Sequence, residues 1–345
     1  MPKQTHRTKD INKTLGTLRM MASRNETVEQ STSIIFIDDK ALVFDGEMLV
    51  CCPSPFEELS GAIPAEETKV LTGFTGESVE VELTESELLF SQKRRKAGIR
   101  RNAEVLSPCS LVPTPTKFRR LKQSIRSRIL QAGQCCSRDE SDPRTTHIHI
   151  TPDRIEGTDT IRVFRSKGST GFKSSVLIHN QNMLRLFKLG DIVGVCQDEG
   201  EYIHFKMDSG FIVSILQCAG DFYDEEVLTG ILTPSAAKKI EFPKNILEVV
   251  ERVEQMEESE AGSWRSNFSI SLKDGKALVR AQKEDGWFSE AIRVQYKGPA
   301  FRFSIHPDLL KALLQCTSKM LLEKNRLLVL LDDSEYATAL DHEES

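Results

Sequence analysis

Three stretches of the chain repeat one order of sequence patterns, and this repeat limits the possible fold more than any other feature. Each stretch opens with apolar residues at helical spacing, in residues 11–23 (INKTLGTLRMMAS), 116–130 (TKFRRLKQSIRSRIL) and 245–256 (NILEVVERVEQM). Two alternating strands, a short second helix and a strand hairpin are expected to follow each opening helix. The period is too long for a solenoid repeat, so it indicates whole domains.

The repeat and the length of 345 residues predict three domains, at residues 1–112, 113–228 and 229–345. Turn-rich segments mark the boundaries near residues 110–114 (SLVPT) and 227–234 (VLTGILTP). We expect an α+β fold in which two helices of each domain pack on antiparallel sheets. The second helices are predicted in residues 63–74, 178–189 and 305–316, where Pro64 and Pro307 stand at positions that a helix start tolerates.

The apolar positions of the opening helices predict which face each helix buries. Four residues form this stripe in each of the first two helices and three form it in the third: Ile11, Leu15, Leu18 and Ala22; Phe118, Leu121, Ile125 and Ile129; Ile246, Val250 and Val253.

Positive charge gathers on the predicted exposed faces of these helices, although the whole chain has a net charge of −5. The middle opening helix is the most basic, and the third is diluted by Glu248, Glu251 and Glu254. A solvated helix face usually mixes charge signs, because like charges one turn apart repel. The concentration of cations therefore favours a polyanionic partner. Few aromatic residues are interleaved with them, which favours the backbone of duplex DNA over stacked single-stranded bases.

The order and spacing of these segments resemble the bacterial-type DNA sliding clamp, the beta subunit of DNA polymerase III. The resemblance covers nearly the whole chain and is carried by residues 117–125 (KFRRLKQSI), 155–164 (IEGTDTIRVF), 174–188 (SSVLIHNQNMLRLFK), 220–228 (GDFYDEEVL) and 301–314 (FRFSIHPDLLKALL). It implies three tandem clamp-type domains and a head-to-tail homodimer that closes a six-domain ring around duplex DNA. The ring would tether a DNA polymerase and be opened by a clamp-loader ATPase.

The resemblance also assigns roles to individual residues. Arg24 and Arg144 match DNA-contacting positions of the family. With the cations of the helices they give the expected DNA-binding set: Lys13, Arg19, Arg24, Lys117, Arg119, Arg120, Lys122, Arg126, Arg144, Arg185, Lys188, Lys244 and Lys311. A pocket for partner peptides is expected between the second and third domains, formed by Thr158, Ile161, Arg162, Val163, Ser304 and Pro307.

Three departures from the family pattern stand out. Thr160-Ile161 replaces the Gly-His of the family's pocket loop, and the chain reads TALDHEES where the family has a last strand and a Met-Pro-Met-Arg-like tail. The strand before the first helix is expected to be short or missing. These losses would fit a divergent clamp such as a phage-encoded one.

No catalytic residue, metal site or cofactor is predicted. His147 and His149 alternate on one strand and are expected to be a surface pair, while Asp38-Asp39 and Asp332-Asp333 fit hairpin turns. The basic segment 92–101 (QKRRKAGIRR) is expected at the edge of the first domain, facing the acidic third domain of a neighbouring protomer.

Two other functions stay open at this point. A transcription regulator would read a DNA groove with the basic helix of residues 116–130, and a DNA-processing enzyme would use Asp38 or Asp332. The chain has no apolar run long enough for a membrane helix and no apolar signal core near residue 1, so it is expected to stay in the compartment where it is made. The resemblance to sliding clamps implies that this location is the cytoplasm, at the replisome. Dimer and trimer are not distinguished by the sequence.

Overall fold

The computed structural model describes residues 4–121, 124–198, 200–256 and 268–341. Contacts divide the chain into two compact units, one made of Met1–Arg126 and Thr170–Ala219 and the other of Ser127–Ser169 and Gly220–Ser345. The two predicted boundaries between the three domains fall at residues other than the limits of these units, and the three-domain division stays a prediction.

The first unit contains two antiparallel sheets. The smaller sheet has the order β1 (Gln4–Arg7), β6 (Ser78–Leu83), β7 (Glu87–Gln92), β8 (Arg95–Arg100). The larger has the order β5 (Gly61–Pro64), β2 (Ser33–Ile37), β3 (Lys40–Phe44), β4 (Met48–Pro53), β16 (Ile212–Leu216), β15 (Tyr202–Met207), β14 (Ile192–Cys196), β9 (Arg119–Arg120). The pairing of β4 with β16 joins strands of the first predicted domain to strands of the second. β13 (Val176–His179) also belongs to this unit.

The second unit is built in the same way. One sheet runs through β10 (His147–Ile150), β11 (Arg154–Thr158), β12 (Arg162–Lys167), β25 (Ser334–Ala339), β24 (Arg326–Leu330), β23 (Lys319–Leu322), β17 (Lys238–Glu241) and β21 (Gln295–Tyr296). The other has the order β20 (Gly286–Arg293), β19 (Lys276–Lys283), β18 (Ser269–Lys273), β22 (Phe301–Ser304). Here β12 pairs with β25, so strands of the second and third predicted domains share one sheet.

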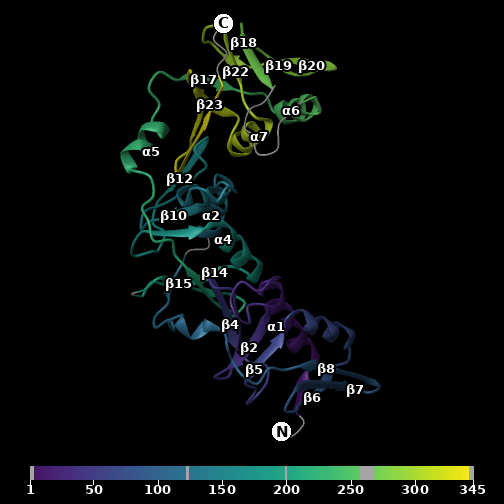
Figure 1. The fold of residues 1–345 in the computed structure, drawn as a ribbon. Coiled ribbons are helices and arrows are strands. Elements are labelled where there is room, and N and C mark those ends of the chain that lie inside the picture. The colour runs from purple at the N-terminus through teal and green to yellow at the C-terminus, as the bar shows by residue number, and fades with distance from the viewer. Residues whose placement is uncertain (1–3, 122–123, 199, 257–267, 342–345) are drawn as a thin grey trace. The chain divides into compact units, whose positions relative to one another are not determined.

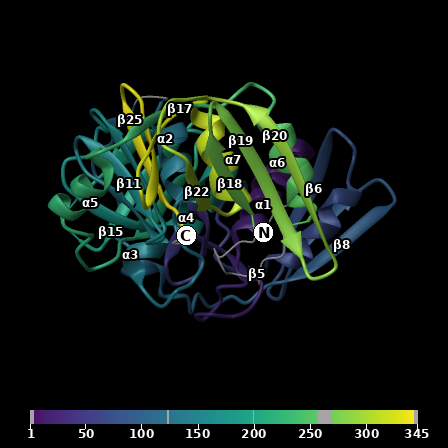
Figure 2. The same cartoon turned by 90° about the horizontal axis from the view of Figure 1, so that it is seen from above.

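The helices confirm the predicted repeat of an opening helix, strands, a second helix and a hairpin. The opening helices are α1 (Thr8–Met21), α2 (Ile125–Gln134) and α6 (Ile246–Glu254). The second helices are the 3-10 helix η1 (Glu66–Gly73), α4 (Asn180–Leu186), which continues as η3 (Phe187–Leu189), and α7 (Pro307–Cys316). The remaining short helices are η2 (Pro108–Leu111), α3 (Pro143–Thr146) and α5 (Glu225–Leu232). In both ribbon views α6 and α7 lie beside each other against the strands of the second unit (Figures 1 and 2).

Two details of the prediction need correction. The buried stripe of α1 ends on Met21, which is 1% exposed, whereas Ala22 caps the helix and is only half-buried. The segment expected to be turn-rich at residues 227–234 forms most of α5, because Leu228 and Leu232 lie one turn apart and are both buried. The strand before α1, expected to be short or missing, is present and short: β1 has four residues and pairs with β6.

The two predicted hairpin turns are confirmed: Asp38 and Asp39 lie between β2 and β3, and Asp332 and Asp333 lie between β24 and β25. Asp38 and Asp39 connect β2 with β3 and adopt φ angles of 50° and 58°. This left-handed conformation is one that aspartate tolerates better than most residues with a side chain. None of the helices in the described part of the chain has the length and apolarity of a membrane span.

Candidate nucleic-acid interface and peptide pocket

Helix α1 and the residues after it present cations that form no ion pair with a carboxylate of the described residues. Its buried stripe faces the sheets, which leaves Lys9 and Lys13 exposed on the opposite side and Arg19 half-buried near the end. Arg24 follows the helix and is exposed. None of these four side chains forms an ion pair with any residue that the structure describes. This surface is therefore available to an anionic ligand.

The segment predicted as the most basic helix begins as a loop that leads into the short strand β9, so the prediction of a helix over residues 116–130 is wrong in its first half. Arg119 and Arg120 form β9 and pair with Val195 and Gly194 of β14. A Cβ at Gly194 would lie 3.2 Å from the carbonyl oxygen of Arg119, so the glycine permits this close approach. Pairing with an open sheet edge gives the backbone its hydrogen bonds, and it avoids stacking like charges on successive helical turns.

The cations of this segment are thus distributed over a loop, a strand and a helix. Lys117 lies exposed before β9, and Arg120 is exposed on it. Arg119 is half-buried and donates a hydrogen bond to Gln197 Oε1 at 3.0 Å. Lys122 lies outside the described residues. Phe118 and Leu121 precede α2, so of the predicted stripe only Ile125 and Ile129 belong to the helix.

Arg126 and Arg144 are neutralised by neighbouring carboxylates. Arg126 lies 2.5 Å from Asp191 and over the ring of Phe187. Arg144 binds Asp142 through both carboxylate oxygens, and this contact lowers the pKa of the Asp142 carboxyl. Both arginines carry less available charge than the sequence suggested.

Arg185 has a structural role between the first two repeats. It lies 2.6 Å from Asp45 and donates a second hydrogen bond to the carbonyl oxygen of Met21 at 2.8 Å. It therefore caps the end of α1, where a cation is favourable for the helix dipole. Lys188, three residues later, is exposed and has no ion pair among the described residues.

The third repeat offers little free positive charge on its helices. Lys311 of α7 lies 2.7 Å from Glu254 and 3.0 Å from Asp308. Burial disfavours its charged form, but hydrogen bonds to these two carboxylates outweigh burial and raise the pKa of Lys311 above its usual value. Lys244, before α6, is exposed and unpaired within the described residues.

The end of β25 brings the two predicted parts of the peptide pocket together. The backbone N–H of Ala339 donates to the Ile161 carbonyl at 2.8 Å, and Asp341 exchanges backbone hydrogen bonds with Ser304. Val163 pairs with Ala337 in the same sheet. Residues 161–163 and Ser304 are thus linked through one short stretch of strand.

Hydrogen bonds fix the loop that carries the first part of this site. The Thr158 hydroxyl donates to the Arg162 carbonyl at 2.7 Å, and the Arg162 guanidinium binds Asp159 at 2.9 Å. Burial raises the pKa of Asp159, and the charge of Arg162 offsets this only in part. Pro307 is buried at the first turn of α7, where its missing N–H leaves no broken hydrogen bond.

Sequence reasoning missed the apolar residues that border Val163. Leu228 and Leu232 of α5 pack with Val163, Leu328 and Ala337, and Ile231 and Leu321 pack partly buried against this cluster. The i, i+4 spacing of the two leucines was the available signal. Any peptide that reaches Val163 would therefore meet α5 as well.

Comparison with solved structures identifies the class of fold. The chain has the sliding-clamp fold of DNA polymerase III beta subunits. It is similar to the sliding clamp of Bartonella birtlesii bound to griselimycin (TM-score 0.83, 15% identity, 99% of each chain). It is likewise similar to a putative beta subunit of Eubacterium rectale (TM-score 0.80, 14% identity, 98% of each chain) and to the beta subunit of Thermotoga maritima (TM-score 0.77, 14% identity, 99% of this chain and 100% of the other).

At the level of sequence the chain is far more distant. No protein-family model matches it, and no curated protein is found to be similar. The agreement in fold over nearly the whole chain therefore rests on structure, with about one residue in seven identical.

Proposed function

We propose that this protein is a DNA sliding clamp, a processivity factor that encircles duplex DNA without reading its sequence. The observation that carries the proposal is the match of the whole chain to clamp structures. The unpaired cations of α1 support it, because phosphate neutralisation holds DNA loosely and independently of sequence. The protein would act without catalysis, in the cytoplasm at the replisome.

The ring would form from two copies joined head to tail. β8 and β20 are the last strands of their sheets, so each has an edge open for pairing with another chain. Arg95, Lys96 and Arg100 are exposed on β8, and Trp287 of β20 is 62% exposed. An exposed aromatic residue on an open edge strand favours a protein interface.

The partners of such a ring would be a DNA polymerase and a clamp-loader ATPase. We place their docking peptide at the site of Thr158, Ile161, Arg162, Val163, Ser304 and Pro307, bordered by α5. The regulator alternative loses support, because its reading helix would need residues 119–120, which form a strand.

Retention on circular DNA tests the proposal. With a clamp loader and ATP, the protein should stay on a nicked circular plasmid in a sizing column at salt that removes nonspecific binders, and should be lost after the plasmid is cut once. Equal loss from both DNA forms would contradict an encircling clamp. Equal retention on both forms would indicate ordinary surface binding.

A further inference from the structure

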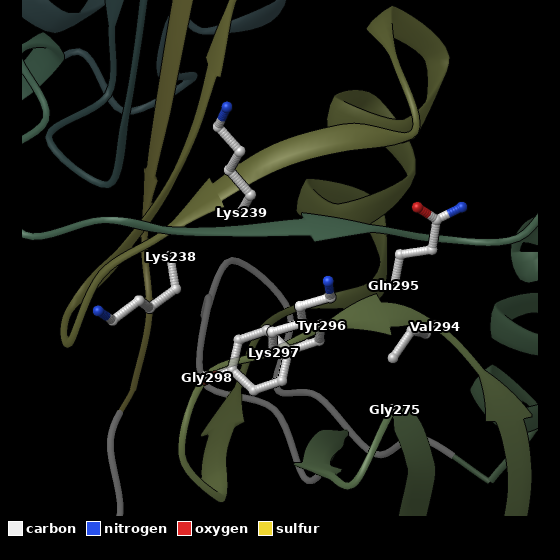
Figure 3. A pocket seen from close by; sticks show the side chains of 8 residues that line it. All are labelled: Lys238, Lys239, Gly275, Val294, Gln295, Tyr296, Lys297 and Gly298. Carbon is white, nitrogen blue, oxygen red and sulfur yellow. The ribbon is translucent and has the colours of Figure 1, made fainter.

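A cavity of about 520 Å³ lies in the second unit, and none of its lining residues belongs to the sets assigned to DNA or to the peptide pocket. Strands β17 and β21 and the β18–β19 turn surround it (Figure 3). Its lining residues are Lys238, Lys239, Gly275, Val294, Gln295, Tyr296, Lys297 and Gly298. β21 is the last strand of its sheet, so the cavity is a groove along a sheet edge.

Short-range contacts fix the apolar floor of the groove. The hydroxyl of Tyr296 donates to the Pro299 carbonyl at 3.0 Å, and Tyr296 is only 6% exposed. A Cβ at Gly298 would lie 2.2 Å from that hydroxyl, so the glycine lets the turn close over the ring. Val294 donates a backbone hydrogen bond to Gly275 at 2.9 Å. The floor is thus held in place without a ligand.

Three lysines line the groove. Lys238 and Lys239 extend from β17 in different directions, and Lys297 follows the end of β21 (Figure 3). All three are exposed, and none forms an ion pair with a residue that the structure describes. By contrast, Lys311 in the same unit has two carboxylate partners.

A second row of cations lies beside the groove. Lys276 stands directly opposite Lys273 on one side and Arg293 on the other, across β18, β19 and β20. Like charges directly opposite each other destabilise a sheet. These three side chains also have no ion pair within the described residues. The chain therefore keeps an arrangement that an anionic ligand would stabilise.

The charge around the groove is strongly positive. Residues 238–241, 273–276 and 293–298 contain six cations (Lys238, Lys239, Lys273, Lys276, Arg293, Lys297) and two carboxylates (Glu241, Asp274), which leaves a net charge of +4. This excess contrasts with the net charge of −5 for the whole chain.

We propose that this groove binds an acidic peptide segment of a partner protein, with one apolar side chain seated over Val294 and Tyr296. The positive charge of the groove favours acidic residues in the peptide. The fixed apolar floor favours one apolar side chain of the peptide as its anchor. A nucleic acid strand is a poorer fit, because Tyr296 is the single aromatic residue that the structure describes in the lining of the groove, and stacking of successive bases needs several. The proposal does not depend on the function in DNA replication.

Fluorescence anisotropy with a short labelled peptide, a central tryptophan flanked by acidic residues, tests this site on the full chain. We expect saturable binding that weakens at least about tenfold in the double variant Lys238→Glu, Lys297→Glu. The double variant Lys40→Glu, Lys206→Glu makes the same charge change at exposed lysines of the other unit and should bind as the unchanged protein does. Equal binding by all three proteins would overturn the proposal.

Two altered probes separate the parts of the proposal. Replacing the tryptophan of the peptide by glycine should weaken binding, and unchanged affinity would overturn the role of the apolar floor. A labelled oligothymidine should bind more weakly than the peptide at equal salt. Tighter binding of the oligothymidine that is lost in the Lys238→Glu, Lys297→Glu variant would instead assign the groove to nucleic acid.

Discussion

At the scale of single residues, the buried ionic network around Glu156 differs most from the expectation for its segment. Glu156 is 2% exposed and lies 2.6 Å from Arg165 and 2.7 Å from His149. His149 is itself buried and stacked on Phe222, so the prediction that it lies on the surface is wrong. Arg165 also donates to Thr229 of α5 at 2.9 Å. The network thus ties β11 and β12 to the helix beside the peptide pocket.

Removing one charge from this network should be costly. Arg165→Met leaves the Glu156 carboxylate buried beside fewer partners and should lower the free energy of unfolding by about 3–5 kcal/mol at neutral pH. The double variant Glu156→Gln, Arg165→Met removes both charges and should recover part of that loss. Urea unfolding monitored by circular dichroism measures the free energy of unfolding of both variants. If Arg165→Met were as stable as the unchanged protein, the buried network would not stabilise the fold.

The same network gives the pH dependence a defined sign. Burial raises the pKa of Glu156, but hydrogen bonds from His149 and Arg165 and the charge of Arg165 outweigh it, so the pKa lies below the ordinary 4.5. A depressed carboxyl pKa stabilises the fold above the unfolded value, and this stability is lost as pH falls through the folded value. The difference between the unchanged protein and Arg165→Met should therefore shrink below about pH 4.5.

At the scale of elements, the helices of the three repeats differ in how much free positive charge they carry. The cations of the α1 region have no ion pair among the residues that the structure describes, whereas Lys311 of α7 is held by two carboxylates. A basic residue that is already paired must break its ion pair before it can neutralise a phosphate. We therefore expect the first repeat to contribute more to DNA binding than the third.

The salt dependence of DNA binding tests this difference between helices. Changing Lys13, Arg19 and Arg24 to alanine should lower the slope of log K against log salt by up to about 2.7, because each phosphate contact contributes about 0.9. Lys311→Ala, the control, should leave the slope unchanged. An unchanged slope in the triple variant would show that this surface does not meet phosphates.

At the scale of the whole molecule, assembly should depend on the open sheet edges. Trp287 and Phe288 on β20 are 62% and 37% exposed, which is unfavourable unless another surface covers them. Changing both to glutamate should convert the proposed dimer into monomers, as measured by sedimentation velocity. The matched variant Leu330→Glu, Leu331→Glu alters residues that are 41% and 42% exposed on another hairpin and should remain dimeric. A dimer that survives the first change would assign the interface elsewhere.

The sequence by itself determined the repeat, the secondary structure of most of it and the α+β class. These features follow from local spacing: α1 and α6 bury Leu15 and Val250 as predicted, and Asp38 and Asp39 form a turn. Local spacing also contains the signal for α5 in Leu228 and Leu232, although the turn-rich composition of the segment predicts a domain boundary there.

The tertiary structure decided which charges are free and where the basic segment changes conformation. Arg119 and Arg120 pair with the edge strand β14, and Arg185 forms an ion pair with Asp45, which lies far away in the sequence. The alternative helix is locally plausible, so only the partner strand selects between the two conformations. Net charge and helical spacing do not depend on such distant partners, whereas hydrogen bonds and ion pairs do, because folding brings together residues whose separation along the chain carries no signal.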